Sequence, residues 1–170
     1  MTTSLVLTVI APDKPGLVEL ISNTVAAHQG NWLESSMSRL AGKFAGILTV
    51  TVPSDRTSAL VSALEALESQ GLKIVTEVSQ EPASANQKSL TLELIGHDKA
   101  GIVRDISQAL AKRHINVERL STELVSGSMS AEELFKARAE LMAPADTDLD
   151  DLQEALEAIA SDLMVDISLN

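Results

Sequence analysis

The chain has 170 residues, 24 of them acidic and 13 basic, which gives a net charge of −11 at pH 7. This acidity argues against direct binding of nucleic acid or of an anionic membrane surface, because both need clustered Lys and Arg. The lack of cysteine excludes disulfides, thiolate metal sites and a cysteine nucleophile. No apolar stretch approaches the ~20 residues of a membrane helix, and the first residues lack the basic segment of a signal peptide. We therefore expect a cytoplasmic protein.

The first residues predict a strand and then a helix. Residues 4–11 are β-branched and aliphatic, which is typical of a strand. Apolar residues then recur at helical spacing from Leu17 to Val25. Asp13 is the candidate N-cap of this helix, and Pro15 would lie in its first turn.

A hairpin, a second helix and a fourth strand follow in the first half of the chain. Residues 31–40 and 44–52 flank a short turn and predict the hairpin. The second helix is expected to begin after a cap at Ser54 or Asp55, and residues 72–78 predict a strand. The order of elements is therefore β-α-β-β-α-β.

The second half repeats this order. Strands are predicted over residues 89–95 and 164–169, and the return strand of a hairpin alternates from Phe135 to Leu141. The two helices carry the apolar residues Ile102, Val103, Ile106 and Leu110, and Leu149, Leu152, Leu156 and Ile159. Each half has the ferredoxin-like plan of an α+β protein, an antiparallel sheet with both helices on one face.

The two halves also share sequence. Residues 13–18 (Asp-Lys-Pro-Gly-Leu-Val) recur, at an offset of 85 positions, as residues 98–103 (Asp-Lys-Ala-Gly-Ile-Val). A repeat of this length is a whole domain. We therefore expect two tandem domains, residues 1–80 and 89–170, joined by a polar linker over residues 81–88.

The second copy differs from the first in an insertion and in charge. The insertion lies within residues 126–134, with a short turn of helix expected from Ser130. It is either a tolerated loop or an element that docks a partner. Residues 1–85 carry a net charge of −3 and residues 86–170 a net charge of −8. The second half is therefore the expected docking surface for a protein partner.

Other functions of this fold need residues that the chain lacks. An RNA-recognition motif needs a basic surface with stacking aromatics, and a soft-metal carrier needs a Cys-x-x-Cys loop. Asp146, Asp148 and Asp150 imitate the spacing of a calcium-binding loop, but Asp151 stands where the sharp turn needs Gly. We interpret these residues as an acidic first helical turn. The sequence holds no catalytic constellation, so we expect no enzyme activity, no metal and no other cofactor.

The repeated loop carries a resemblance to a known family. The chain resembles the ACT domain, an amino-acid-sensing regulatory module, in its strand–Asp-Lys-Pro-Gly–helix junction and in the Asn that opens each second strand. Ala100 replaces the usual Pro in the second copy. Two tandem copies that fill nearly the whole chain resemble the glycine cleavage system transcriptional repressor family.

The loop has the chemistry to hold a zwitterion. A helix N-terminus offers N–H groups to a carboxylate, and Gly16 and Gly101 let a small ligand approach the backbone. The structural alternative is that Asp13 and Asp98 cap helices and that the glycines serve tight turns. The resemblance implies that the ligand lies between paired ACT domains, touching this loop on one and the early second strand of its neighbour. The candidate ligand-binding residues are Asp13, Lys14, Pro15, Gly16, Leu17, Asn31, His97, Asp98, Lys99, Gly101, Ile102 and Asn116.

The resemblance implies a regulatory protein that binds a small amino acid, glycine or a similar one. Its expected partner is a DNA-binding transcription factor or a regulated enzyme, contacted as protein, with no direct binding of nucleic acid or membrane. A homodimer is expected. The alternative is an ACT unit without ligand, which acts as a scaffold, a dimerisation module or a regulatory subunit of a metabolic enzyme.

Overall fold

The computed structural model describes residues 1–80, 86–126 and 133–170. The chain divides into two compact units, Met1–Pro82 and Ala83–Asn170, which we call unit 1 and unit 2. The expected turn of helix from Ser130 lies outside the described residues, as do residues 81–85 of the expected linker.

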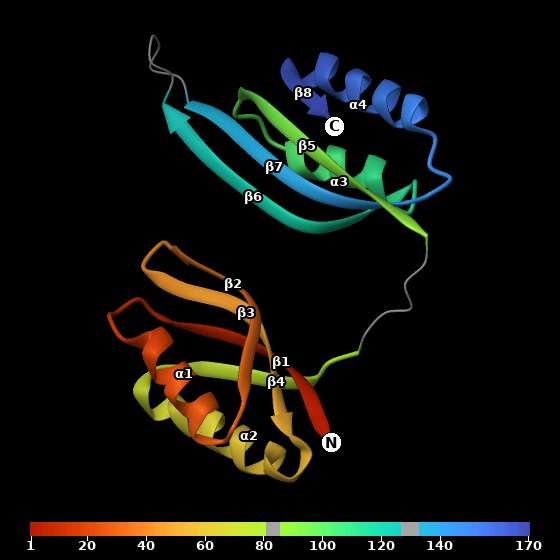
Figure 1. The fold of residues 1–170 in the computed structure, drawn as a ribbon. Helices are drawn as coiled ribbons and strands as arrows, with labels where there is room; N and C mark the ends of the chain where they lie inside the picture. The colour runs from red at the N-terminus through yellow and green to blue at the C-terminus, as the bar shows by residue number, and fades with distance from the viewer. Residues whose placement is uncertain (81–85, 127–132) are drawn as a thin grey trace. The chain divides into compact units, whose positions relative to one another are not determined.

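Unit 1 is a four-stranded antiparallel sheet with its helices on one face (Figure 1). The sheet order is β2-β3-β1-β4, so β1 and β3 are the central strands. The 3-10 helices η1 and η2 flank α2 and lengthen it at both ends. The elements are β1 (Thr2–Pro12), α1 (Leu17–Ala27), β2 (Asn31–Leu40), β3 (Lys43–Pro53), η1 (Ser54–Arg56), α2 (Thr57–Glu65), η2 (Ala66–Gln70) and β4 (Lys73–Val78).

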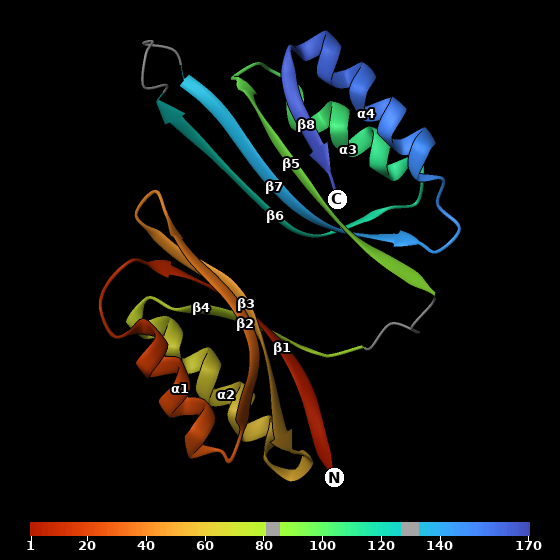
Figure 2. The same ribbon diagram turned by 45° about the horizontal axis from the view of Figure 1, so that its top comes forward.

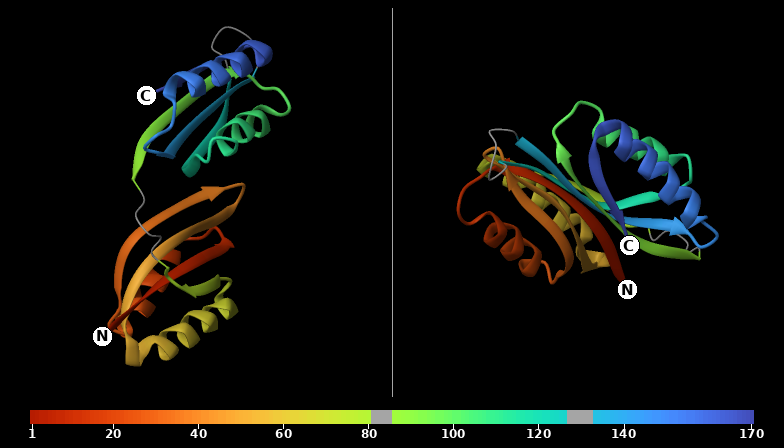
Figure 3. Two further views of the ribbon diagram at one scale, coloured as in Figure 1. Left: turned by 90° about the vertical axis from the view of Figure 1, so that its right-hand side faces the viewer. Right: turned by 90° about the horizontal axis from the view of Figure 1, so that it is seen from above.

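Unit 2 repeats this topology with the order β6-β7-β5-β8 (Figure 2). Both views in Figure 3 keep the two helices of each sheet on the same side of that sheet. The predicted α+β class, with two ferredoxin-like βαββαβ units, is therefore confirmed. The elements are β5 (Gln87–His97), α3 (Ile102–Ala111), β6 (Asn116–Ser126), β7 (Glu133–Pro144), α4 (Leu149–Leu163) and β8 (Val165–Leu169).

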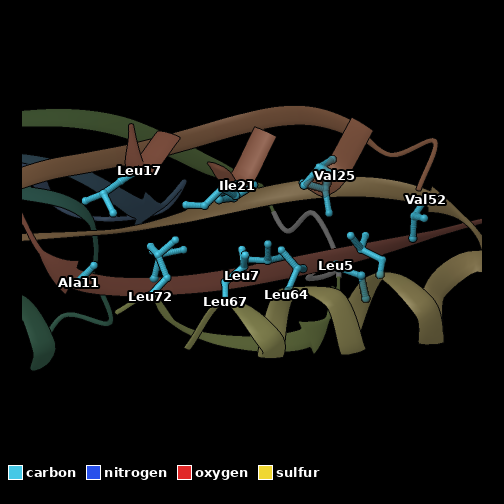
Figure 4. Close-up of a cluster of buried hydrophobic side chains, with 14 residues drawn as sticks. Leu5, Leu7, Ala11, Leu17, Ile21, Val25, Val52, Leu64, Leu67 and Leu72 are labelled. Carbon is cyan, nitrogen blue, oxygen red and sulfur yellow. The ribbon is translucent and has the colours of Figure 1, made fainter. Parts of the chain in front are cut away.

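The core of each unit lies between its sheet and its helices and is aliphatic. In β1 the buried residues alternate from Leu5 to Ala11, which puts every second side chain against the helices. Ile21 of α1 and Leu64 of α2 are fully buried against this face (Figure 4). Each helix therefore buries one apolar stripe, as its sequence spacing predicted.

The predicted helix caps of unit 1 are wrong. Gly16 is the N-cap of α1, with φ 90° and ψ 2°, and no side chain caps this helix. Asp13 and Pro15 consequently lie in the loop ahead of the helix. Neither Ser54 nor Asp55 caps α2 with its side chain, because both belong to η1, which follows β3 directly.

Two further expectations about single elements need correction. β5 begins at Gln87, so the end of the expected linker, residues 87–88, belongs to the sheet. Val18 and Val103 are about half exposed, at 47% and 43%, because they lie beside the buried stripe of their helices.

Among the described residues, no helix is both long and apolar enough to span a membrane.

Candidate ligand-binding loops

The loop between β1 and α1 ends in a left-handed glycine. Gly16 has φ 90°, a conformation that L side chains rarely adopt. Its carbonyl accepts the first helical hydrogen bond, from Leu20 N at 3.0 Å. A Cβ on Gly16 would meet nothing within 4 Å. The backbone conformation therefore requires glycine here, and the space in front of it is open.

Three contacts hold this loop against the rest of unit 1. The backbone N–H of Asp13 donates to the Gly42 carbonyl at 3.0 Å, which ties the loop to the β2–β3 turn. The Asp13 carboxylate pairs with Arg39 at 3.5 Å. Lys14 Nζ donates to the Gln70 carbonyl at 3.0 Å, at the end of η2. The loop is thus fixed from two sides while its outer surface is left open.

A hollow of about 310 Å³ lies at this loop. This volume is at the small end of the range for ligand pockets, which suits an amino acid. Four of its lining residues, Asp13, Lys14, Gly16 and Leu17, were predicted from the sequence. The other three, which sequence reasoning missed, are Val18, Glu19 and Phe44.

Register explains how Phe44 reaches the loop. Phe44 follows the β2–β3 turn and pairs with Ala11 of β1, two residues before Asp13. Aromatic residues make up only 2% of the chain, and this rarity was the one signal in the sequence that could have marked Phe44 as part of the site. Val18 is the last residue of the repeated motif and Glu19 follows it; both belong to the first turn of α1.

The hollow combines groups of both signs. The first N–H groups of a helix have no carbonyl acceptor within the helix, and no side chain caps α1. By contrast, Asp148 caps α4, accepting from Asp150 N at 3.1 Å and Asp151 N at 3.2 Å. The uncapped end of α1 can therefore take a carboxylate, while Asp13 and Glu19 can take an ammonium group.

The corresponding loop of unit 2 has the same backbone conformation, but a side chain lies over its glycine. Gly101 has φ 90° and ψ 3° and is the N-cap of α3, so Asp98 is not the cap. A Cβ on Gly101 would lie 2.8 Å from Nη2 of Arg104. Arg104 stands where unit 1 has Glu19, and its Nε also pairs with Asp105 at 3.2 Å. The guanidinium thus covers the surface that is open in unit 1.

The remaining predicted residues of unit 2 surround this loop. His97 ends β5, opposite Leu134, and precedes Asp98. Asp98 N donates to the Glu133 carbonyl at 3.4 Å. Lys99 lies in the loop, and Ile102 is the buried first residue of α3.

The two predicted asparagines lie at the far end of their sheets. Asn31 pairs with Thr51, which pairs with Ser4, whereas the loop follows Pro12, eight residues further along β1. At about 3.3 Å per residue the separation is roughly 26 Å. Asn116 pairs with Met142, which pairs with Ser89 near the start of β5, so Asn116 is equally far from the loop that follows β5.

Neither asparagine can contact a ligand that is held by the loop of its own unit. The amide of Asn116 instead donates to Glu118 Oε1 at 3.1 Å. In the part of the chain that the structure describes, no three His, Cys, Asp or Glu side chains gather into a group that could hold a metal ion.

Comparison with known proteins agrees with this geometry. Residues 3–77 match the model of the ACT domain family. A crystal structure of an unknown protein from Galdieria sulphuraria aligns with all of this chain and 98% of its own, at 28% identity and a TM-score of 0.85. The crystal structure of a candidate glycine cleavage system transcriptional repressor aligns with 100% of this chain and 97% of its own, at 21% identity and a TM-score of 0.69. None of the curated proteins matches the chain.

Proposed function

Because residues 3–77 match the model of the ACT domain family and unit 2 repeats the fold of unit 1, we propose that this protein is an amino-acid sensor that regulates a partner protein. It binds a small amino acid, glycine or a similar one, at the loop before α1. It acts as a homodimer. It regulates by binding its ligand and its partner, and it catalyses no reaction of its own. The partner is a DNA-binding transcription factor, as the resemblance to the glycine cleavage system transcriptional repressor family implies.

The observation that carries the proposal is the open, uncapped N-terminus of α1 behind Gly16. A free amino acid presents a carboxylate and an ammonium group close together. The helix N-terminus and the carboxylates of Asp13 and Glu19 offer partners for both within one small hollow. Pro15, in the same loop, restricts its backbone and so lowers the entropy cost of holding the site in shape.

Asn31 or Asn116 can contact a ligand in this hollow only if the asparagine belongs to a different ACT unit. Asn31 and Asn116 are each about 26 Å from their own loop by the strand geometry above. Contacts from a second ACT unit would therefore make binding depend on how units pair. Such dependence couples ligand to partner affinity, provided that the ligand binds the free and the partner-bound forms unequally.

One observation favours the alternative function for unit 2. Arg104 covers Gly101, and Ala100 replaces the proline of the first loop. We therefore assign the amino-acid site to unit 1 and a scaffolding role to unit 2. In the alternative for the whole chain, neither loop binds a ligand and the ACT units only pair or support a regulated enzyme.

Two glycine variants test the site with matched strain. Gly16 and Gly71 have nearly the same backbone, at φ 90° and 92° and ψ 2° and 0°. An added Cβ meets nothing within 4 Å at Gly16 and only Pro12 Cδ at 3.8 Å at Gly71. Both Ala variants should lose about 1–2 kcal/mol of stability from the left-handed conformation. Only Gly16→Ala adds a methyl group to the hollow.

Calorimetry with glycine, serine and the branched-chain amino acids is the measurement. We expect binding to the wild type and to Gly71→Ala, and weakened binding to Gly16→Ala. No binding of any of these to the wild type would favour the ligand-free scaffold. Equal binding to both variants would move the site away from this loop.

A further inference from the structure

The sheet face of unit 1 that points away from its helices carries its charges at the periphery and none at its centre. In β1 the buried side chains face the helices, so the alternate ones, Val6, Thr8 and Ile10, lie on this open face. The same alternation applies to the other strands. We call this surface the open face; its further members are Glu34, Ser36 and Ser38 of β2, Lys43, Ala45, Ile47 and Thr49 of β3, and Lys73, Val75 and Glu77 of β4.

Charge on the open face lies at its periphery. Glu34 is on the edge strand β2 and Lys43 is the first residue of β3, whereas the other members on β2, β3 and β1 are small, hydroxyl or β-branched. Lys73 and Glu77 lie on β4, at one edge of the sheet. Ile10, Ile47 and Val75 are 46%, 55% and 59% exposed. Neighbouring β-branched residues left this open on a sheet mark an interaction surface.

The equivalent face of unit 2 carries charge at its centre. Arg138 and Glu93 occupy the positions of Ile47 and Thr8 and form an ion pair at 2.8 Å. Every strand of that face bears charge: Arg119 and Glu123 on β6, Lys136, Arg138 and Glu140 on β7, Glu93 on β5 and Asp166 on β8. The two faces share one backbone plan and differ at their centre, which is charged in unit 2 and uncharged in unit 1.

We propose that the open face of unit 1 binds the open face of a second copy of this chain, sheet against sheet around a two-fold axis. A two-fold interface sets each residue against the same surface patch of its mate, so charged residues near its centre oppose like charges. The chain carries a net charge of −11, so contact between two copies over most of their surface brings carboxylates together. The uncharged centre of the open face avoids this repulsion.

The size of the open face suits a weak dimer. Three strands of about ten residues and the six-residue β4, at about 4.8 Å spacing, cover roughly 570 Å². Two such faces bury roughly 1,100 Å² in total, which lies just below the range for stable interfaces and within that for weak ones. A weak, concentration-dependent dimer is therefore expected, with Ile47 and Thr8 near its centre.

The proposal rests on the homodimer in the proposed function but not on ligand binding. The mass of the protein is measured by sedimentation equilibrium in the absence of any amino acid. A failure of calorimetry to detect ligand therefore leaves this result intact, and a monomer leaves the ligand site intact.

Substitution of Ile47 by Arg tests the face with a side chain that the fold accepts. Arg138 holds the equivalent position in unit 2, so Ile47→Arg should fold. It sets two guanidinium groups against each other in the dimer, and we expect the dimer dissociation constant to rise by at least about a hundredfold. Ala59→Arg places the same charge on the exposed side of α2 and should leave the dimer unchanged.

Cross-linking gives a second measurement, because the chain has no cysteine of its own. Facing sheets stand about 10 Å apart, which is too far for a disulfide, so a short bismaleimide is used. Thr8→Cys should cross-link to twice the chain mass and Ala59→Cys should not. A wild-type monomer up to high micromolar concentration, an Ile47→Arg dimer as tight as the wild type, or equal cross-linking of both cysteines would each overturn the proposal.

Discussion

Arg104 lies over Gly101, whereas the equivalent glycine of unit 1, Gly16, has open space in front of it. The two loops have the same backbone conformation and nearly the same sequence. A single exchange in the first helical turn, Glu19 in one unit and Arg104 in the other, separates an open loop from a covered one. The repeat in the sequence therefore does not imply two equal sites.

Replacement of Arg104 by Glu should open the second loop. The variant gives unit 2 the side chain that unit 1 carries at this position, and it removes the guanidinium from Gly101. We expect the number of amino acids bound per chain, measured by calorimetry, to rise from one to two. Lys112→Glu makes the same charge change at the far end of α3 and should leave the number at one. A value of one for Arg104→Glu would show that this side chain does not close the loop.

Leu64→Ala should destabilise unit 1 by about 2–5 kcal/mol, because the Leu64 side chain is fully buried between α2 and the sheet. The single Trp of the chain, Trp32, packs against the same core, so its fluorescence reports the unfolding of unit 1 in urea. Leu40→Ala is the control, since Leu40 is 78% exposed, and it should change stability by less than about 0.5 kcal/mol. Equal effects of the two variants would contradict the assigned core.

Loss of the Asp148 cap should destabilise unit 2 alone. The carboxylate accepts two backbone N–H groups at the start of α4, and its removal should cost about 1 kcal/mol. Circular dichroism should show an earlier unfolding phase, while Trp32 fluorescence keeps the wild-type midpoint. Asp146→Ala, two residues ahead of the cap, should shift neither signal. A shift of the fluorescence midpoint in Asp148→Ala would show that the two units unfold together.

Gly46→Ala should destabilise unit 1 although Ala stands at the equivalent position of unit 2, Ala137. In unit 1 a Cβ at Gly46 would run into the Ser36 carbonyl and would lie 2.6 Å from Met37 Cγ. The strands β2 and β3 must move apart to admit it, at a cost of about 1–3 kcal/mol. Thermal unfolding followed by Trp32 fluorescence should show a lower midpoint than that of Ala45→Ser. A midpoint equal to that of the wild type would mean that β2 shifts freely.

Much of the fold could be predicted because it depends on local patterns. Alternation in β1 and helical spacing in α4 each identify the buried side of an element within a few residues of chain. The capping prediction failed for Asp13 because the choice between Asp13 and Gly16 depends on where the chain turns, and that is set by the contact of Asp13 N with Gly42. Phe44 and Glu19 were missed because the loop motif does not include them.

The sequence by itself determined the two-domain plan, the aliphatic core and the loop that recurs in each unit, because repeats and periodicity are properties of the chain. Only the tertiary structure decided which of these loops is open, since Arg104 covers Gly101 through the path of its side chain in space. It also separated Asn31 from Asp13, because β1 and β2 carry them to opposite ends of one sheet. The charge of each sheet face became visible in the same way, once strand register had brought residues distant in sequence to neighbouring positions.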